Sequence, residues 1–238
     1  MWDRNGTMEN YDYIYKNFQD LKNEISALSA DRGRPVTLVA VTKSGSDEEL
    51  LALAKAGADN IGENRPGELR RRGDILYEAG FSPALHEIGN LQRNKVKYII
   101  RDVSLIHSLD NLPLAAEIDR RAAEIGRCIP TLIEINSGRE PNKGGILPED
   151  AEEFLLELKK FEHISIAGLM TMGPVCENPE EARPYFRLTK ELFDDLNSRY
   201  EFAGGGILSM GMSDSYAVAI EEGSTLVRVG RKLFAKKN

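Results

Sequence analysis

A lysine that directly follows a strongly apolar run is the residue of this sequence with the clearest potential for chemistry. Leu38 to Thr42 are all aliphatic or β-branched, which is typical of a strand buried on both faces of a parallel sheet. Lys43 then places a primary amine at the carboxyl end of that strand, the edge where parallel α/β folds bind ligands. Such an amine can condense with a carbonyl group. A surface lysine in an ordinary strand-to-helix loop is the alternative interpretation.

Two glycine-containing loops follow the last two apolar strands of the pattern. They read Met210-Gly211-Met212-Ser213 and Gly230-Arg231. Glycines let backbone N–H groups approach an anion closely. Ser213 also stands at a predicted helix start, where the helix dipole favours negative charge. These loops therefore predict a phosphate site, although glycines in loops also serve turns alone.

A phosphate site opposite a strand-end amine indicates one cofactor in particular. Pyridoxal phosphate carries an aldehyde that condenses with a lysine amine, and a phosphate that needs N–H donors. Arg228, in the last apolar strand, would face the pyridine nitrogen or else form a salt bridge across the rim. A guanidinium that stays charged disfavours protonation of that nitrogen, and this weakens the ring as an electron sink.

The elements that must position these groups alternate regularly along the chain. Apolar residues from Ile14 to Leu28 recur at spacings of four and three, which predicts an amphipathic leading helix over residues 8–30. From residue 36 to residue 230, apolar strands alternate with helical patterns. The predicted strands with their exits cover 38–43, 59–64, 84–89, 103–107, 129–135, 164–170, 206–210 and 225–229. This alternation predicts an α/β fold, a (β/α)8 barrel of the TIM type in one domain with an extra N-terminal helix.

Local signals place helix starts beside several strand exits. Ser46 and Glu49 have the spacing of a capping box, Asn111 precedes an apolar stripe, and Ser213 is expected to cap the helix after the seventh strand. A doubly wound open sheet is the alternative fold, although its G-x-G-x-x-G fingerprint is absent after the first strand. A barrel brings all strand exits to one mouth. At or near this mouth we expect Lys43, Asn64, His86, His107, Asn136, Met170, Ser209 and Arg228.

The composition argues against several classes of protein. The 238 residues carry a net charge of −7, which disfavours a nucleic-acid binder that neutralises phosphates. Two cysteines and three scattered histidines fit neither a disulfide framework nor a metal motif. No apolar run approaches the length of a membrane span, and the N-terminus lacks the apolar region of a signal peptide. We therefore expect a protein of the reducing cytoplasm with no metal, no membrane contact and no nucleic-acid partner.

Seven stretches of the chain together resemble one protein family. They are Ala40–Lys43, Gly62–Asn64, His86–Lys95, Lys143–Gly145, Gly168–Met170, Leu208–Asp214 and Gly223–Gly230. In this order they are similar to the pyridoxal phosphate homeostasis proteins, the YggS family, which is related to the N-terminal barrel of alanine racemase. The resemblance extends over nearly the whole chain from about residue 36.

The resemblance implies roles for individual residues. Lys43 would form a Schiff base with pyridoxal phosphate, and Arg228 would approach the ring nitrogen. Residues expected to hold the phosphate or line the cofactor are Asn64, Met170, Ser209, Gly211, Met212, Ser213 and Gly230. Arg231 stands where the family has threonine, so it either contacts the phosphate or points to solvent. His86, Asn136 and Lys143 would line the pocket, with a packed core histidine as the alternative for His86.

The resemblance also implies a function, a non-catalytic carrier that binds pyridoxal phosphate and related B6 vitamers and supplies apo-enzymes. The alternative is a weak pyridoxal-phosphate-dependent amino-acid racemase, which needs a second acid or base opposite Lys43. No tyrosine falls in a predicted strand-exit loop, with Tyr216 the nearest, and the chain ends at Asn238 without the second domain of alanine racemase. Both observations favour a carrier, and the second favours a monomer. A sugar-phosphate isomerase or aldolase would instead combine Lys43 with Glu63 as its acid or base.

Overall fold

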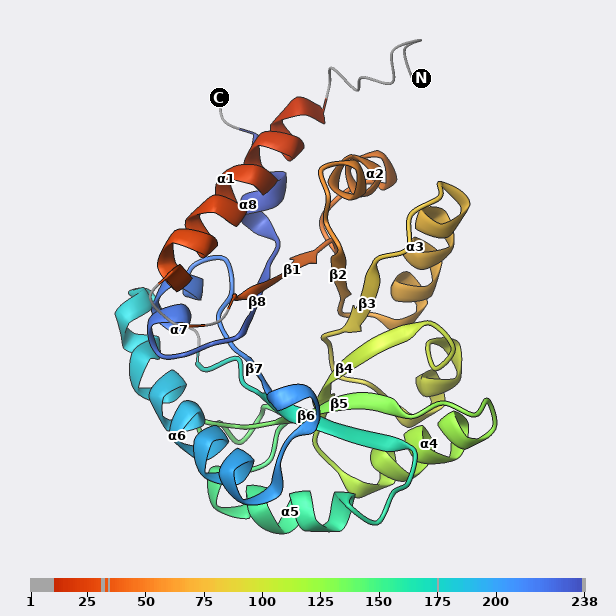
Figure 1. The fold of residues 1–238 in the computed structure, drawn as a ribbon, viewed down its shortest axis with the longest axis vertical. Coiled ribbons are helices and arrows are strands. Elements are labelled where there is room, and N and C mark those ends of the chain that lie inside the picture. The colour runs from red at the N-terminus through yellow and green to blue at the C-terminus, as the bar shows by residue number, and fades with distance from the viewer. Residues whose placement is uncertain (1–10, 31–32, 34, 175, 237–238) are drawn as a thin grey trace.

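The computed structural model describes residues 11–30, 33, 35–174 and 176–236. In these residues eight parallel strands pair in sequence order and close into a barrel that helices surround (Figure 1). The (β/α)8 prediction, with one extra helix before the first strand, is therefore confirmed. The strands are β1 (Thr37–Val41), β2 (Asn60–Glu63), β3 (Ala84–Glu87), β4 (Val103–Leu109), β5 (Ile129–Glu134), β6 (Ile164–Met170), β7 (Ile207–Ser209) and β8 (Leu226–Val229). The α-helices are α1 (Asp12–Ser29), α2 (Asp47–Lys55), α3 (Pro66–Glu78), α4 (Leu112–Ala123), α5 (Ala151–Leu158), α6 (Arg183–Tyr200), α7 (Tyr216–Glu221) and α8 (Arg231–Phe234), and the 3-10 helices are η3 (Arg93–Tyr98), η4 (Pro148–Asp150), η5 (Pro179–Ala182) and η6 (Ala203–Gly205).

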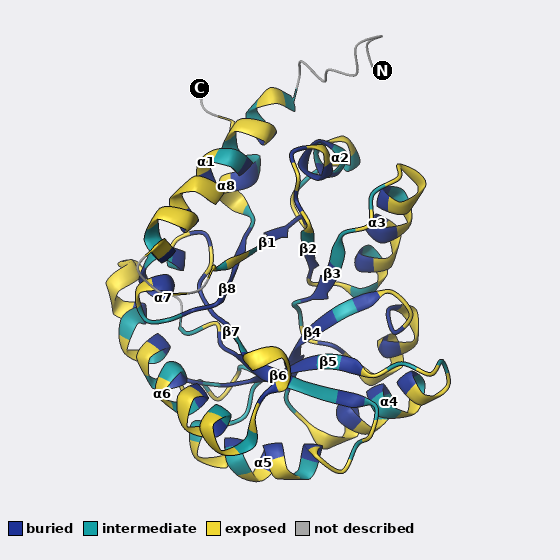
Figure 2. Cartoon of the chain, viewed as in Figure 1, coloured by how far each residue is buried: buried dark blue, intermediate teal, exposed yellow. Residues whose placement is uncertain are grey.

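Alternation along the strands divides their side chains between the barrel interior and the surrounding helices. The interior holds one compact apolar cluster, formed by Val39, Leu105, Leu132, Ala167, Met170 and Leu226. A larger cluster joins the outer faces of the strands to the helices, so buried residues follow the strands and the inner helix faces (Figure 2). Because Val39 of β1 is level with Arg228 of β8, the register turns Arg228 toward the interior.

Helix α1 closes one side of the barrel by packing on α2, α7 and α8. Its buried apolar side chains have the spacing that predicted a helix, and they are Ile14, Phe18, Leu21 and Ile25. The Asn17 amide donates to the carbonyl of Leu233 at 3.1 Å and to that of Ala235 at 2.9 Å. The first helix therefore holds α8 in place at the opposite end of the chain.

The predicted helix starts are confirmed at two positions and wrong at a third. Ser46 and Glu49 form the capping box of α2, and the Asn111 side chain caps α4. Ser213 does not cap α7, which begins three residues later at Tyr216. The Ser213 hydroxyl is turned instead toward the loop after β8, which a pattern of neighbouring residues does not reveal.

The fourth strand is longer than the sequence pattern predicts. It continues to Leu109, so His107 is a buried residue within the strand and does not lie at its exit. His86 is likewise buried within β3. Both imidazoles therefore lie inside the barrel, below the mouth where they were expected.

In the part of the chain that the structure describes, no helix has the length and apolar character needed to cross a membrane. The same residues contain no group of three or more metal-ligating side chains. Cys128 and Cys176 are free thiols.

Candidate functional site

Lys43 lies two residues beyond β1, at the carboxyl end of the barrel. The N–H of Thr42 donates to the carbonyl of Gly62 at 3.1 Å, which continues the β1–β2 ladder past the strand. The Thr42 hydroxyl donates to Glu63 Oε1 at 2.5 Å, and Glu63 pairs with Arg72 of the outer helix α3. Since side chains alternate, this outward turn of Thr42 places Lys43 on the inner side of the mouth. The Lys43 side chain is exposed and has no hydrogen bond or ion pair to any described residue.

A buried ion pair holds the turn that carries Lys43. Arg72 Nε lies 3.0 Å from Glu63 Oε1, and Arg72 Nη2 donates to the carbonyl of Gly45 at 2.7 Å. Both side chains of the pair are at most 5% exposed. Gly45 has no space for a side chain, because a Cβ there would lie 2.4 Å from the Phe234 ring of α8. Helices α3 and α8 therefore fix the turn from two sides.

Replacing Arg72 by methionine is expected to destabilise the protein by about 3–5 kcal/mol, because the buried Glu63 loses the cation with which it forms its ion pair. Arg71→Met is the matched control, since Arg71 pairs with Asp47 and Glu68 on the surface and exposed pairs contribute roughly 1 kcal/mol or less. Urea unfolding followed by circular dichroism measures both variants. Equal midpoints for the two would contradict a clamping role for Arg72.

Arg228 is the cation of the inner mouth. It is level with Val39 of the interior cluster and is 4% exposed. Its guanidinium donates to the hydroxyl of Ser209 and, at 3.1 Å, to the carbonyl of Thr171. Burial lowers the pKa of Arg228 to about 10, and the Glu134 carboxylate opposes this shift. The guanidinium is therefore charged at neutral pH.

Glu134 is a titratable group at the mouth that no sequence motif singles out. It ends β5 two residues after Leu132 of the interior cluster, so alternation turns its carboxyl inward. Burial, with the charge of Asp110 adding to it, raises the pKa of Glu134 to about 7, and Arg228 opposes the shift. The available signal was the strand itself, in which every second side chain faces inward. Residues 129–133 do not alternate regularly between apolar and polar types, so the sequence does not show which face is inner.

The two glycine loops meet at the mouth beside Arg228. The N–H of Gly230 donates to the Ser213 hydroxyl at 3.3 Å, and the N–H of Arg228 donates to the Gly211 carbonyl at 3.1 Å. Gly211 has a φ of +92°, and a Cβ there would lie 2.5 Å from a side chain of α7. The backbone N–H groups of Ser213 and Asp214 have no acceptor in the described part of the chain. Packing therefore explains the glycine, and the free N–H groups are the donors that an anion would use.

The other predicted cofactor contacts differ widely in exposure. Met170 is buried in the interior cluster, whereas Asn64 and Met212 are exposed after their strands. Arg231 points to solvent, where it pairs with the exposed Asp214. This placement corresponds to the second of the two alternatives that the sequence left open for Arg231.

Asn136 and Lys143 organise the long loop after β5. Asn136 Oδ1 accepts from the N–H of Glu140 at 3.1 Å, and Asn136 Nδ2 donates to the Glu140 carbonyl at 3.0 Å. Lys143 Nζ lies 2.6 Å from a carboxylate oxygen of the same glutamate. Together with Glu134 they line a small hollow of the mouth. Both side chains thus have protein partners, unlike Lys43.

The two acid or base groups that the sequence offered for the alternative functions, Tyr216 and Glu63, are engaged elsewhere. Tyr216 is buried, and the Lys232 ammonium donates to its hydroxyl at 2.6 Å. Glu63 faces Thr42 and Arg72 on the outer side of the barrel. Neither side chain is therefore placed to face Lys43 across the mouth.

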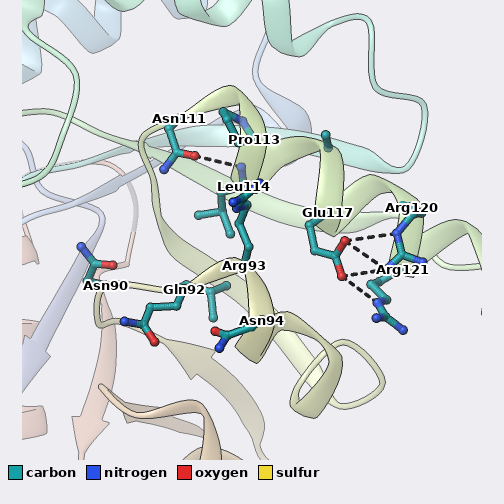
Figure 3. Close-up of a pocket in the computed structure, with 12 residues that line it drawn as sticks. Asn90, Gln92, Arg93, Asn94, Asn111, Pro113, Leu114, Glu117, Arg120 and Arg121 are labelled. Carbon is teal, nitrogen blue, oxygen red and sulfur yellow. Dashed lines mark hydrogen bonds and ion pairs between the residues drawn. The ribbon is translucent and has the colours of Figure 1, made fainter.

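A groove of about 1000 Å³ lies on the barrel rim, between η3 and α4 (Figure 3). Its polar walls include Asn90, Gln92, Arg93 and Asn94 from the segment after β3. Neither Lys43 nor Arg228 lines this groove. It is therefore a surface feature beside the mouth, separate from the site that holds the amine and the guanidinium.

The closed (β/α)8 barrel of this chain belongs to a class of barrels known from alanine racemase. The family model described as "Alanine racemase, N-terminal domain" matches residues 11–237. The solved alanine racemase of Clostridium difficile has the same fold, with a TM-score of 0.71 at 20% identity over 95% of this chain and 56% of that chain.

Relatives of similar length identify the family within this class of barrels. A "Pyridoxal phosphate homeostasis protein" of Aquifex aeolicus is 42% identical over 200 residues, which are 84% of this chain and 86% of that protein. PipY of Synechococcus elongatus, solved with pyridoxal phosphate bound, is 28% identical with a TM-score of 0.80, covering 93% of this chain and 100% of that chain. This chain belongs to the pyridoxal phosphate homeostasis protein family, and the resemblance seen in its sequence is confirmed.

Proposed function

We propose that this protein binds pyridoxal phosphate reversibly at the mouth of its barrel and serves the homeostasis of that cofactor without robust catalysis of its own. The observation that carries the proposal is the amine of Lys43, which has no partner among the described residues although a buried ion pair holds its turn at the mouth. The amine would add to the aldehyde and expel one water molecule, and the addition of water would release cofactor and lysine again.

The other groups of the mouth match the remaining parts of this cofactor. Arg228 would face the pyridine nitrogen, while the free N–H groups after β7 and the Gly230 loop would hold the phosphate. The bound cofactor supplies an electrophilic aldehyde on an electron-withdrawing ring. A charged guanidinium disfavours protonation of the ring nitrogen, and this weakens electron withdrawal. Arg228 therefore suits storage better than catalysis. The residues proposed to line the cofactor are Asn64, Met170, Ser209, Gly211, Met212 and Ser213.

A weak racemase activity remains the second candidate, and one observation favours it. Glu134 is an inward acid whose pKa of about 7 suits proton transfer at neutral pH. Racemisation needs acid or base groups on both faces of the substrate carbanion, so Glu134 would have to act opposite Lys43. The carrier is favoured because the Arg228 guanidinium works against the electron withdrawal that racemisation requires.

The proposed role includes supply of the cofactor to apo-enzymes. Release by water needs no group beyond the exposed mouth, and PipY has been solved both with and without pyridoxal phosphate. We propose a monomer acting in the reducing cytoplasm, a compartment that suits the two free thiols, Cys128 and Cys176.

Absorption spectroscopy with reductive trapping tests the proposal. Protein mixed with pyridoxal phosphate is expected to turn yellow, and borohydride is expected to leave a pyridoxyl group on the peptide that contains Lys43. Loaded protein, freed of excess cofactor, should reactivate an apo-aminotransferase, whereas borohydride-reduced protein should not. Racemase assays on the same preparation, with Glu134→Gln beside them, separate the two candidates. A protein that stays colourless with added cofactor would overturn the proposal. A sugar-phosphate isomerase or aldolase would then be the favoured function.

A further inference from the structure

A continuous chain of polar side chains crosses the interior of the barrel and ends on Arg228. Asn60 Oδ1 lies 3.0 Å from His86 Nε2, and His86 Nδ1 lies 3.0 Å from His107 Nε2. His107 Nδ1 lies 3.0 Å from the hydroxyl of Ser209, which also accepts from the Arg228 guanidinium. Five strands thus contribute one link each, namely β2, β3, β4, β7 and β8.

The direction of this chain follows from its end at Arg228, because a guanidinium only donates. Ser209 accepts from Arg228, and the one acceptor for the Ser209 hydroxyl in the described residues is His107 Nδ1. His107 then carries its proton on Nε2 and donates to His86 Nδ1. His86 likewise carries its proton on Nε2 and donates to Asn60 Oδ1. The reverse direction would leave the buried hydroxyl of Ser209 without an acceptor, which is unfavourable.

Both imidazoles must be neutral for this chain to form. His107 is completely buried and His86 is 5% exposed. Burial lowers the pKa of His86 to about 4 and that of His107 well below its usual range, and the charge of Arg228 adds to the effect on His107. A proton on either ring would convert one accepting nitrogen into a donor and break a link of the chain.

The chain reaches the opposite end of the barrel from the mouth. Asn60 is the first residue of β2 and is partly exposed. It lines a cavity of about 290 Å³ between α1 and the starts of the first two strands, together with Phe18, Thr37 and Asp59. The floor of the barrel and the guanidinium at the mouth are therefore joined by four side chains.

We propose that Asn60, His86 and His107 are positioning residues, which set the orientation of Arg228 toward the cofactor from the barrel floor. The inference rests on the proposed function, since it concerns the guanidinium that would face the pyridine nitrogen. Two donors of Arg228 are directed at Ser209 and the Thr171 carbonyl, so the guanidinium cannot rotate without losing them. Removing the acceptor at Asn60 leaves the His86 Nε2–H without a hydrogen-bond partner. This favours rearrangement of the hydrogen bonds that connect His86 to Arg228.

Nitrogen-15 NMR of the histidine rings tests the direction of the chain without any cofactor. The protein has only three histidines, and a His163→Gln variant assigns the half-exposed one by loss of its signal. His86 and His107 are both expected as neutral Nε2–H tautomers at pH 7. A ring of either residue that carries its proton on Nδ1, or on both nitrogens, would overturn the proposal.

Cofactor retention by an Asn60→Leu variant tests the effect on Arg228. Asp59→Asn is the matched control, because Asp59 lines the same floor cavity but forms no link of the chain. Asn60→Leu is expected to retain pyridoxal phosphate about tenfold less tightly and to displace the pH midpoint of the bound absorption band, while Asp59→Asn changes neither. An unchanged band and unchanged retention in Asn60→Leu would overturn the positioning role. If the Asn60→Leu variant does not fold, Asn60→Ala is measured in its place.

These outcomes separate the inference from the proposed function on which it rests. A wild-type protein that fails to bind pyridoxal phosphate would remove the proposed function itself, whatever the tautomers are. If the wild type binds pyridoxal phosphate and the Asn60 variants show unchanged retention and an unchanged absorption band, the proposed carrier function is retained. Only the positioning role is then rejected.

Discussion

The Lys43→Ala variant is expected to lose the yellow absorption of the loaded protein and all borohydride-stable labelling. The alanine cannot form a covalent bond to the aldehyde, so only the contacts to phosphate and ring remain. We expect retention of pyridoxal phosphate to weaken by at least about 100-fold, which corresponds to about 2.7 kcal/mol. The fold should survive, because the exposed Lys43 side chain has no partner among the described residues and the Glu63–Arg72 pair is untouched. Spectral titration and peptide mass spectrometry measure both effects.

Lys95→Ala is the control for this experiment. Lys95 is another exposed lysine on the rim, in η3, where its ammonium lies 5.5 Å from the Tyr98 ring centroid. Its replacement should leave the absorption and the labelled peptide unchanged. Stoichiometric labelling of Lys43→Ala at another lysine, for example Lys143, would place the covalent site elsewhere and contradict the assignment.

The second large effect concerns stability. We expect the wild-type protein to lose stability between about pH 4.5 and pH 8 as Glu87 becomes charged, and Glu87→Gln to remove this loss. Glu87 ends β3 and is completely buried. Its Oε1 accepts from the N–H of Gly89 at 3.1 Å, and its Oε2 has no partner in the described residues. Burial, with the charge of Glu63 adding to it, raises the pKa of Glu87 from 4.5 to about 8. The glutamine keeps an acceptor for Gly89 and cannot become charged.

The sign of the effect follows from proton binding in the two states. Between pH 4.5 and pH 8 the folded protein holds a proton on Glu87 that the unfolded chain has released, so stability falls as the pH rises. Each unit of pKa difference is worth about 1.4 kcal/mol, so the whole loss is on the order of 5 kcal/mol and is complete above the folded pKa. Wild type and Glu87→Gln should therefore be similar near pH 4 and diverge toward pH 9.

Urea unfolding at a series of pH values measures this divergence. The difference between the two curves isolates Glu87, because the buried Glu134 is present in both proteins. Glu153→Gln, at an exposed position of α5, should leave the curve of the wild type unchanged. Parallel curves for Glu87→Gln and the wild type would show that Glu87 keeps an ordinary pKa in the folded protein.

Much of the fold and part of the site could be predicted from short stretches of sequence. The eight apolar runs, the capping box at Ser46 and the cap at Asn111 depend on residues within one turn or one strand of each other. The wrong predictions arose where a distant partner decided the outcome. Ser213 has cap spacing, yet the N–H of Gly230 binds its hydroxyl. His107 was expected at a strand exit because the pattern does not show how far β4 continues.

The sequence by itself determined that this chain forms an eight-stranded barrel and that an amine follows the first strand. It did so because alternation, caps and glycines act between residues a few positions apart. Only the tertiary structure decided which side chains share the barrel interior. Ser209 and His107, which are hydrogen-bonded, are 102 positions apart in the sequence, and Arg72 and Gly45, which are also hydrogen-bonded, are 27 positions apart. Closure and register of the strands bring these residues together, and the resulting burial moves the pKa of Glu87, Glu134 and His86 far from their usual values.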